Sequence, residues 1–169
     1  MKPAAAAAAA TTQSLFVYGT LMAPAVTQTL LRRLPAHAPA ILTGFARHPV
    51  RSEVFPGLVH GTAPADSVTG MLYKELTVRE FQVLDWYEDL ASGDYDRIAV
   101  VTAAGVSLRD DPEQQQQLPA QVYVWNTPNE QAMHMDRDWC FARFERDSLQ
   151  EFLEQTVRPC RNELDQLGL

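Results

Sequence analysis

The sequence of 169 residues contains little cysteine, little glycine and no long apolar run. Its two cysteines, Cys140 and Cys160, cannot build a disulfide framework and indicate thiols kept in a reducing compartment. No stretch approaches the roughly 18 apolar residues of a membrane-spanning helix. Lys and Arg total 14 against 21 Asp and Glu, and this net charge of −7 argues against binding to a phosphate backbone. We therefore expect neither a nucleic-acid partner nor a membrane partner.

Familiar signatures of enzyme sites are also missing. The eight glycines form no G-x-G pair, which argues against a dinucleotide-binding loop and a P-loop. There is no G-x-S-x-G elbow and no C-x-x-C, and the four histidines are not spaced as metal ligands. A thiol nucleophile made from Cys140 and His134 is an alternative, although packing on a C-terminal helix suits Cys140 better. We predict no metal site and no cofactor.

The length and the 46% share of hydrophobic residues fit one globular domain, which we place at residues 15–169. Residues 1–14 contain seven consecutive alanines behind Lys2. Alanine is too weakly apolar for a signal peptide, so we expect a disordered tail and, by default, a cytoplasmic protein. A second biased patch, the glutamines at 114–117, lies between prolines and is expected to be a surface loop.

The pattern of apolar and polar residues along the sequence predicts interspersed strands and helices and therefore an α+β fold. Apolar runs at 15–18, 95–103 and 122–125 are typical of strands, and several short strands are expected between 41 and 75. A helix should begin at Pro24, and a capping box at Thr77 and Glu80 should open another that extends to about Leu90. Asp136 is expected to cap a long amphipathic C-terminal helix.

One acidic residue lies on the apolar side of the capped helix. Phe81, Leu84 and Glu88 are spaced at i, i+3 and i+7, which places Glu88 on the apolar stripe, whereas Asp85 and Asp89 should be solvated. Burial disfavours the charged form of a carboxyl group and raises its pKa, so Glu88 is a candidate acid or base. The alternative is that the helix frays before Glu88 and leaves an ordinary surface charge.

The turn at residues 18–23, which we call the 18–23 turn, is a second candidate. A strand ends there and a helix begins, with Gly19 between them. Unpaired amides in such a turn can bind a carboxylate, although an ordinary tight turn would have the same sequence.

Three short motifs together resemble the gamma-glutamylcyclotransferase-like family, in particular its AIG2-like branch. They are F-V-Y-G-T-L at 16–21, L-D-W-Y-E at 84–88 followed by Y-D-R at 95–97, and V-W-N at 124–126. The resemblance implies a compact mixed β-barrel with packed helices and a long C-terminal helix. The six-residue link at 89–94 is longer than the family pattern suggests, and Ala23 replaces a residue that is commonly polar.

The resemblance also implies an activity and a set of site residues. The substrate would be a small γ-glutamyl compound, converted to 5-oxoproline and an amine by attack of its own amino group, with Glu88 as the catalytic acid and base. The implied substrate-binding residues are Tyr18, Gly19, Thr20, Leu21, Met22, Ala23, Tyr95 and Arg97. Arg97 could instead brace Glu88 or a neighbouring acid. The alternative function is a non-catalytic module that binds a small molecule or a peptide end in the same pocket.

Overall fold

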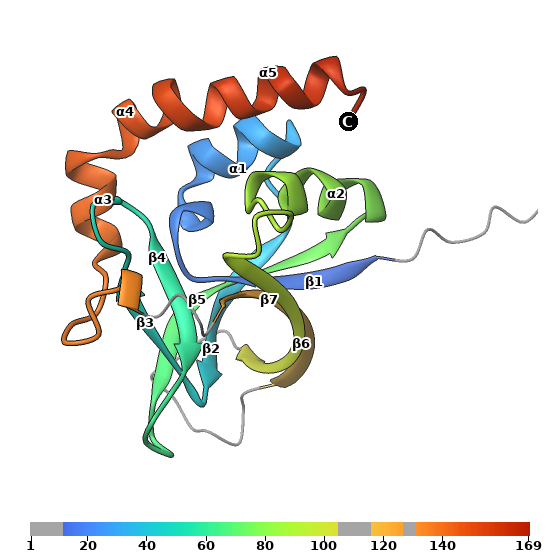
Figure 1. Ribbon diagram of the computed structural model, residues 1–169. Helices are drawn as coiled ribbons and strands as arrows, with labels where there is room; N and C mark the ends of the chain where they lie inside the picture. The colour runs from blue at the N-terminus through green and yellow to red at the C-terminus, as the bar shows by residue number, and fades with distance from the viewer. Residues whose placement is uncertain (1–11, 105–115, 127–130) are drawn as a thin grey trace, which may run out of the picture.

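Five strands close into a barrel in the computed structural model, which describes residues 12–104, 116–126 and 131–169 (Figure 1). The strands are β1 (Gln13–Val17), β2 (His37–Thr43), β3 (Phe45–Pro49), β4 (Pro56–His60), β5 (Ser67–Leu76), β6 (Tyr95–Ala104) and β7 (Gln116–Trp125). The strand order in the barrel is β1-β5-β2-β6-β7, and the barrel closes where β1 pairs in parallel with β7. Strands β3 and β4 form a separate antiparallel pair. The α+β prediction is confirmed.

Strand β1 contacts two hydrophobic clusters because successive side chains of a strand point to opposite faces. Phe16 and Tyr18 belong to a cluster that also takes apolar residues from β2, β5, β6 and β7, which places this cluster inside the barrel. Leu15 and Val17 belong to a second cluster, shared with the helices. Burial on both faces explains why β1 appears in the sequence as an uninterrupted apolar run.

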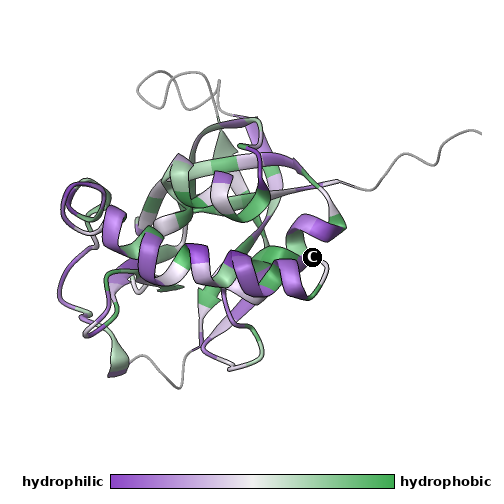
Figure 2. Ribbon diagram, turned by 90° about the horizontal axis from the view of Figure 1, so that it is seen from above, coloured by the Kyte–Doolittle hydropathy of each residue, from purple (hydrophilic) through white to green (hydrophobic). Residues whose placement is uncertain are grey.

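The helices gather on one side of the barrel (Figure 1). They are α1 (Pro24–Leu31), α2 (Val78–Tyr87), α3 (Phe141–Asp147), α4 (Leu149–Phe152) and α5 (Arg158–Gln166), with a short 3-10 turn η1 (Thr20–Met22) and a π-helical turn η4 (Leu153–Val157). Figure 2 shows the C-terminal segment crossing above the other elements with mainly hydrophilic residues along it. No helix of the described residues is long and apolar enough to span a membrane.

The predicted capping box is present at the start of α2. The Thr77 hydroxyl accepts the Glu80 N–H at 3.2 Å, and the Glu80 carboxylate accepts the Thr77 N–H at 2.8 Å. The predicted end of this helix at Leu90 is wrong by three residues. Helix α2 ends at Tyr87 because Asp89 adopts a left-handed backbone conformation with φ 47°. The helix therefore ends just before Glu88, the residue that the sequence pattern indicated as a candidate acid or base.

The predicted cap of the C-terminal helix is also wrong. Helix α3 begins at Phe141 with Cys140 at its N-cap position, so Asp136 and Trp139 precede the helix. Cys140 is exposed instead of packing on the helix. The helical segment then continues through the wider turn η4 into α5, whose second residue is Pro159, a residue without an N–H to donate.

Two expectations fall partly outside the described residues. The tail at 1–14 is described only from residue 12, and β1 already begins at Gln13. Of the expected glutamine loop, residues 114 and 115 lie outside the described residues, whereas Gln116 and Gln117 belong to β7. That strand is longer than predicted because it pairs with β6 over their whole lengths, from Tyr95 opposite Trp125 to Ala104 opposite Gln116.

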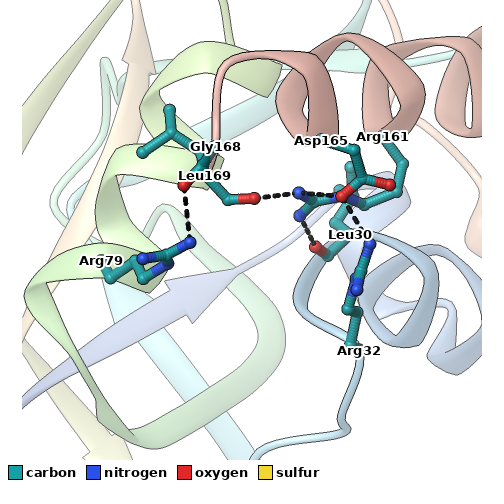
Figure 3. Close-up of polar contacts among 7 residues, drawn as sticks. All are labelled: Leu30, Arg32, Arg79, Arg161, Asp165, Gly168 and Leu169. Atoms are coloured by element: carbon teal, nitrogen blue, oxygen red, sulfur yellow. Dashed lines mark hydrogen bonds and ion pairs between the residues drawn. The ribbon is translucent and has the colours of Figure 1, made fainter.

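A buried arginine fastens the C-terminal segment to α1 (Figure 3). Arg161 is only 8% exposed and donates to the carbonyl oxygen of Leu30 at 2.7 Å, to the Asp165 carboxylate at 2.8 Å and to the oxygen of Leu169. Arg32 donates to the same Asp165 carboxylate at 2.5 Å. These contacts satisfy a carbonyl in the last turn of α1 and hold α5 across that helix.

We expect Arg161→Ala to lower the free energy of unfolding by about 1–3 kcal/mol, because it leaves the buried Leu30 carbonyl without its donor. Urea unfolding of the purified protein measures the change. Arg158→Ala is the matched control, since Arg158 is exposed and lies 3.9 Å from its partner Glu154. Its effect should stay within about 0.5 kcal/mol. Equal effects of the two variants would show that Arg161 does not fasten the helix.

Candidate active site

A cavity of about 560 Å³ lies between the barrel and the C-terminal segment. Its wall includes the end of β1 and the turn that follows, the end of α2, the start of β6 and the end of β7. Residues of α4 and η4 complete the wall. The cavity therefore combines segments from both ends of the sequence.

Glu88 lines this cavity at the C-terminal end of α2. Its N–H bonds the Leu84 carbonyl at 2.8 Å, so the chain is still in helical register there and the carboxylate follows the stripe of Phe81 and Leu84. Within the described residues, the Glu88 carboxylate has no hydrogen-bond donor and no ion-pair partner. Burial, and secondly the charge of Asp85, raise the pKa of Glu88 to about 8.

Four tyrosines from four separate segments of the chain line the cavity with Glu88, but each hydroxyl bonds to a group other than the Glu88 carboxylate. The bonds are Tyr18 to the Tyr123 carbonyl (2.7 Å), Tyr87 with the Thr20 hydroxyl (2.9 Å), Tyr95 to the Pro56 carbonyl (2.7 Å) and Tyr123 to the Asp85 carboxylate (2.8 Å). Burial is the main cause that raises the pKa of all four hydroxyls, and the charge of Glu88 adds to it. The tyrosines therefore stay protonated and leave the carboxylate of Glu88 available to a ligand.

Asp85 is not the solvated acid that the sequence suggested. It accepts the Tyr123 hydroxyl and forms an ion pair with Arg97 at 3.3 Å. The guanidinium of Arg97 also lies 4.7 Å from the centre of the Phe81 ring. Arg97 does not line the cavity and braces the acid next to Glu88, which was the second of the two alternatives. Tyr95, two residues earlier on β6, does line the cavity.

The 18–23 turn contributes its first four residues, Tyr18 to Leu21, to the cavity wall. Within the described residues, the backbone N–H groups of Gly19, Thr20 and Leu21 donate to no acceptor, although all three residues are buried. Met22 and Ala23 lie outside the wall. Ala23 is fully buried in the helix-side core, and Met22 packs against that core.

Close packing, and not an unusual backbone conformation, explains the glycine at position 19. Its φ of −123° is open to other residues, so the glycine is not needed for a left-handed turn. A Cβ at this position would instead lie 2.9 Å from Cγ of Pro56. The turn therefore packs directly against the start of β4.

The sequence alone did not identify several lining residues. They are Glu53 before β4, Trp125 at the end of β7, and Ser148, Glu151 and Gln155 in the C-terminal segment. Trp125 is 7% exposed, and its indole N–H lacks an acceptor among the described residues. Its place in the V-W-N motif was the only signal in the sequence. The others reach the cavity through tertiary packing.

The alternative thiol site is not part of this cavity. Cys140 and His134 are both absent from the cavity wall, and the ring of His134 lies 3.3 Å from the guanidinium of Arg51. No group of three or more potential metal-binding side chains occurs among the residues that the structure describes.

The family model described as gamma-glutamyl cyclotransferase, AIG2-like, matches residues 15–141. Two curated proteins of Arabidopsis thaliana, AIG2-like protein C and AIG2-like protein D, are each 32% identical to the chain. The first match covers 88% of this chain and 78% of the relative, and the second covers 86% and 88%. The chain therefore belongs to the AIG2-like gamma-glutamyl cyclotransferase family, as its motifs suggested.

Solved structures show the same fold. A solution structure of an Arabidopsis thaliana protein matches with a TM-score of 0.61 and 21% identity, over 92% of this chain and 95% of that one. A protein described as gamma-glutamyl cyclotransferase matches with a TM-score of 0.51 and 20% identity, over 69% and 68% of the two chains. The predicted gamma-glutamylcyclotransferase-type barrel is confirmed by these likenesses.

Proposed function

We propose that the protein is a γ-glutamylcyclotransferase that uses Glu88 as its acid and base. The observation that carries this proposal is an unpartnered carboxylate, with a pKa raised to about 8, inside a cavity lined by protonated tyrosines. Such a group exchanges protons near neutral pH, whereas an ordinary glutamate is too weak a base. Membership of the gamma-glutamyl cyclotransferase family supports the same reaction.

The proposed reaction forms one C–N bond and breaks another. The α-amino nitrogen of the γ-glutamyl unit attacks the side-chain carbonyl carbon and closes a five-membered ring. Glu88 removes a proton from this nitrogen and returns one to the leaving nitrogen as the original amide bond breaks. The products are 5-oxoproline and a free amine, and Glu88 ends in its starting protonation state. The steps need only Glu88 and the groups of the substrate.

The unpaired amides of Gly19, Thr20 and Leu21 are proposed to hold the α-carboxylate of the substrate. A carboxylate accepts several N–H groups well, and hydrogen bonds to a charged group are stronger than neutral ones. Holding the carboxylate in the turn would orient the amino group of the substrate toward its own carbonyl, and such orientation lowers the barrier to ring closure. Tyr18 and Tyr95 are proposed to form the walls around this unit.

A direct test is to incubate the purified protein with a panel of γ-glutamyl amino acids and γ-glutamylamines. We expect equimolar 5-oxoproline and amine from at least one compound, measured by chromatography. Tight binding without 5-oxoproline across the panel would instead favour the non-catalytic binding module.

We expect Gly19→Val to raise KM by about tenfold to a hundredfold, with a smaller effect on kcat. The new side chain collides with Pro56, so the turn must shift and its amides move away from the carboxylate. Calorimetry with a γ-glutamyl analogue that lacks the α-carboxylate is the control. This analogue should bind the wild type weakly and lose little further affinity in the variant. If it binds the wild type as tightly as the parent compound, the turn does not hold the carboxylate.

A further inference from the structure

The peptide group that joins Tyr18 to Gly19 has two polar atoms with different surroundings. The Tyr18 carbonyl oxygen accepts a hydrogen bond from the Arg47 guanidinium at 2.8 Å. The Gly19 N–H donates to no acceptor within the described residues, and Gly19 lines the cavity. A trans peptide group is planar, so its C=O and N–H point in opposite directions. Arg47 therefore fixes the direction of the Gly19 N–H by bonding the opposite side of the same group.

The guanidinium of Arg47 is itself held by several contacts. Its Nε and Nη2 donate to the two carboxylate oxygens of Asp138 at 2.9 and 3.0 Å, and Nη1 is the atom that bonds the Tyr18 carbonyl. The guanidinium carbon also lies 5.5 Å from the centre of the Trp139 ring, and the Arg47 side chain is only 10% exposed. Because a guanidinium is planar and rigid, the two bonds to Asp138 also fix the position of Nη1.

Arg47 belongs to the β3–β4 pair, which supports the 18–23 turn at two points. Arg47 of β3 bonds the Tyr18 carbonyl, and Pro56 of β4 packs so closely against Gly19 that no Cβ would fit there. The carbonyl of Pro56 also accepts the Tyr95 hydroxyl of the cavity wall at 2.7 Å. The turn is therefore held by packing at Gly19 and by a hydrogen bond at the residue before it.

The position of Arg47 also suits an anionic ligand. Among the described residues that line the cavity there is no lysine, arginine or histidine, so a carboxylate in the turn would meet only neutral N–H groups. A cation bonded to a peptide carbonyl polarises the group and makes its N–H a stronger donor. Arg47 supplies this positive charge from outside the cavity, and its charge is not among the causes that shift the pKa of Glu88.

We propose that Arg47 is a positioning residue for substrate binding, which aims the Gly19 N–H at the α-carboxylate of the γ-glutamyl unit by bonding the carbonyl of the same peptide group. This inference rests on the proposed function and adds a residue outside the cavity wall that controls its affinity for the α-carboxylate. Since Arg47 does not line the cavity, its loss should weaken binding and leave the proton transfers of Glu88 unchanged.

Two compounds that differ only in the α-carboxylate test the inference. They are γ-glutamyl ethylamide and 4-aminobutanoyl ethylamide, which would cyclise to 5-oxoproline and 2-pyrrolidinone, each with release of ethylamine. We expect Arg47→Gln to raise KM for the γ-glutamyl compound by about tenfold or more, as for the loss of one hydrogen bond to a charged group, with kcat within about twofold. For the 4-aminobutanoyl compound, kcat/KM should stay within about twofold. The acid limb of the pH profile should not move.

Arg161→Gln is the matched control. Arg161 is also 10% exposed in its side chain, also donates to a backbone carbonyl, that of Leu30, and also forks onto a carboxylate, that of Asp165, but it does not line the cavity or contact the turn (Figure 3). Its loss should change kcat/KM for the two compounds by the same factor. If Arg47→Gln also affects both compounds equally, its effect is on stability alone and the positioning role is refuted.

Two milder variants keep the test valid if Arg47→Gln does not fold. Arg47→Lys keeps a charged donor for the Tyr18 carbonyl but lacks the fork for Asp138, so KM for γ-glutamyl ethylamide should rise by only about twofold to fivefold. Asp138→Asn should have a similar effect, and Asp138 is exposed enough to tolerate the change. Neither variant should change kcat/KM for the 4-aminobutanoyl compound. An equal loss for both compounds in these variants would refute the positioning role.

A measurement without turnover separates this inference from the proposed function. During titration of the ¹⁵N-labelled protein with γ-glutamyl ethylamide, the Gly19 N–H resonance should move downfield in the wild type and in Arg161→Gln, and much less in Arg47→Gln. Asp138→Asn should give an intermediate shift. If the resonances respond in this way but no 5-oxoproline forms, the positioning role stands and the cyclotransferase proposal fails for this compound. An equal response in all four proteins, or no response in the wild type, would refute the positioning role even if 5-oxoproline is released.

Discussion

Glu88→Gln is expected to abolish the release of 5-oxoproline while the protein remains folded. Glutamine has nearly the same shape as glutamate, but its amide accepts no proton near neutral pH. General acid–base catalysis contributes typically 10²–10⁴-fold, so kcat should fall by at least about 100-fold. Because no described residue bonds the carboxylate, the substitution breaks no contact of the folded protein. Initial rates with the best γ-glutamyl substrate, together with circular dichroism, measure both effects.

Glu163→Gln provides the control for this substitution. Glu163 is an exposed residue of α5 that does not line the cavity, so the variant should keep wild-type rates. Activity of Glu88→Gln within about tenfold of the wild type would remove Glu88 from the mechanism.

The pH dependence of the reaction should show the raised pKa of Glu88. The carboxylate form is the base, and its pKa is about 8 in the unliganded protein. We therefore expect kcat/KM to rise about tenfold per pH unit from pH 6 until it levels off near pH 8. An acid limb near pH 4.5, the ordinary value for glutamate, would show that the cavity does not raise the pKa of Glu88 in solution.

Asp85→Asn should move this acid limb to lower pH. The negative charge of Asp85 raises the pKa of Glu88, and its removal also leaves the charge of Arg97 without its partner. Both changes favour the ionised form of Glu88. Asp89→Asn is the control, since the charge of Asp89 is not among the causes of the shift. A limb that moves equally in both variants would contradict the role given to Asp85.

Folding stability should depend on pH in the opposite direction from activity. The pKa of Glu88 rises from about 4.5 in the unfolded chain to about 8 in the folded protein, so folding favours the protonated form. Its contribution is fully present below pH 4.5 and is lost progressively as the pH rises to about 8. Each unit of the shift corresponds to about 1.4 kcal/mol. Urea unfolding should therefore show Glu88→Gln gaining stability relative to the wild type over this range.

Local patterns in the sequence were sufficient to predict several helices and strands and to place one functional side chain, that of Glu88. The capping box at Thr77 defined the start of α2, and helical periodicity then placed Glu88 on the side that faces the core. The period-two pattern of β6 predicted that strand nearly to the residue. Such signals arise from contacts within one turn or one strand, so a single segment contains all of them.

Local patterns failed where a distant segment decides the outcome. The sequence did not indicate that Asp85 would be held by Tyr123 and Arg97, because these partners come from two other strands. It also placed the start of the C-terminal helix at Asp136, although the residues up to Cys140 remain outside the helix. The start of a helix with weak capping depends on tertiary contacts, here those of Trp139, which donates to the Val54 carbonyl at 2.8 Å.

The sequence by itself determined the family, the α+β class and the acid on the apolar face of α2, because short motifs and periodicity are local properties of the chain. Only the tertiary structure decided what surrounds that acid. The tyrosine hydroxyls bond to other partners, Asp85 lies near enough to raise the pKa of Glu88, and the C-terminal segment brings Glu151 to the cavity wall. Burial and electrostatic environment are sums over residues distant in sequence, so they exist only once the barrel has closed and the C-terminal segment has packed beside it.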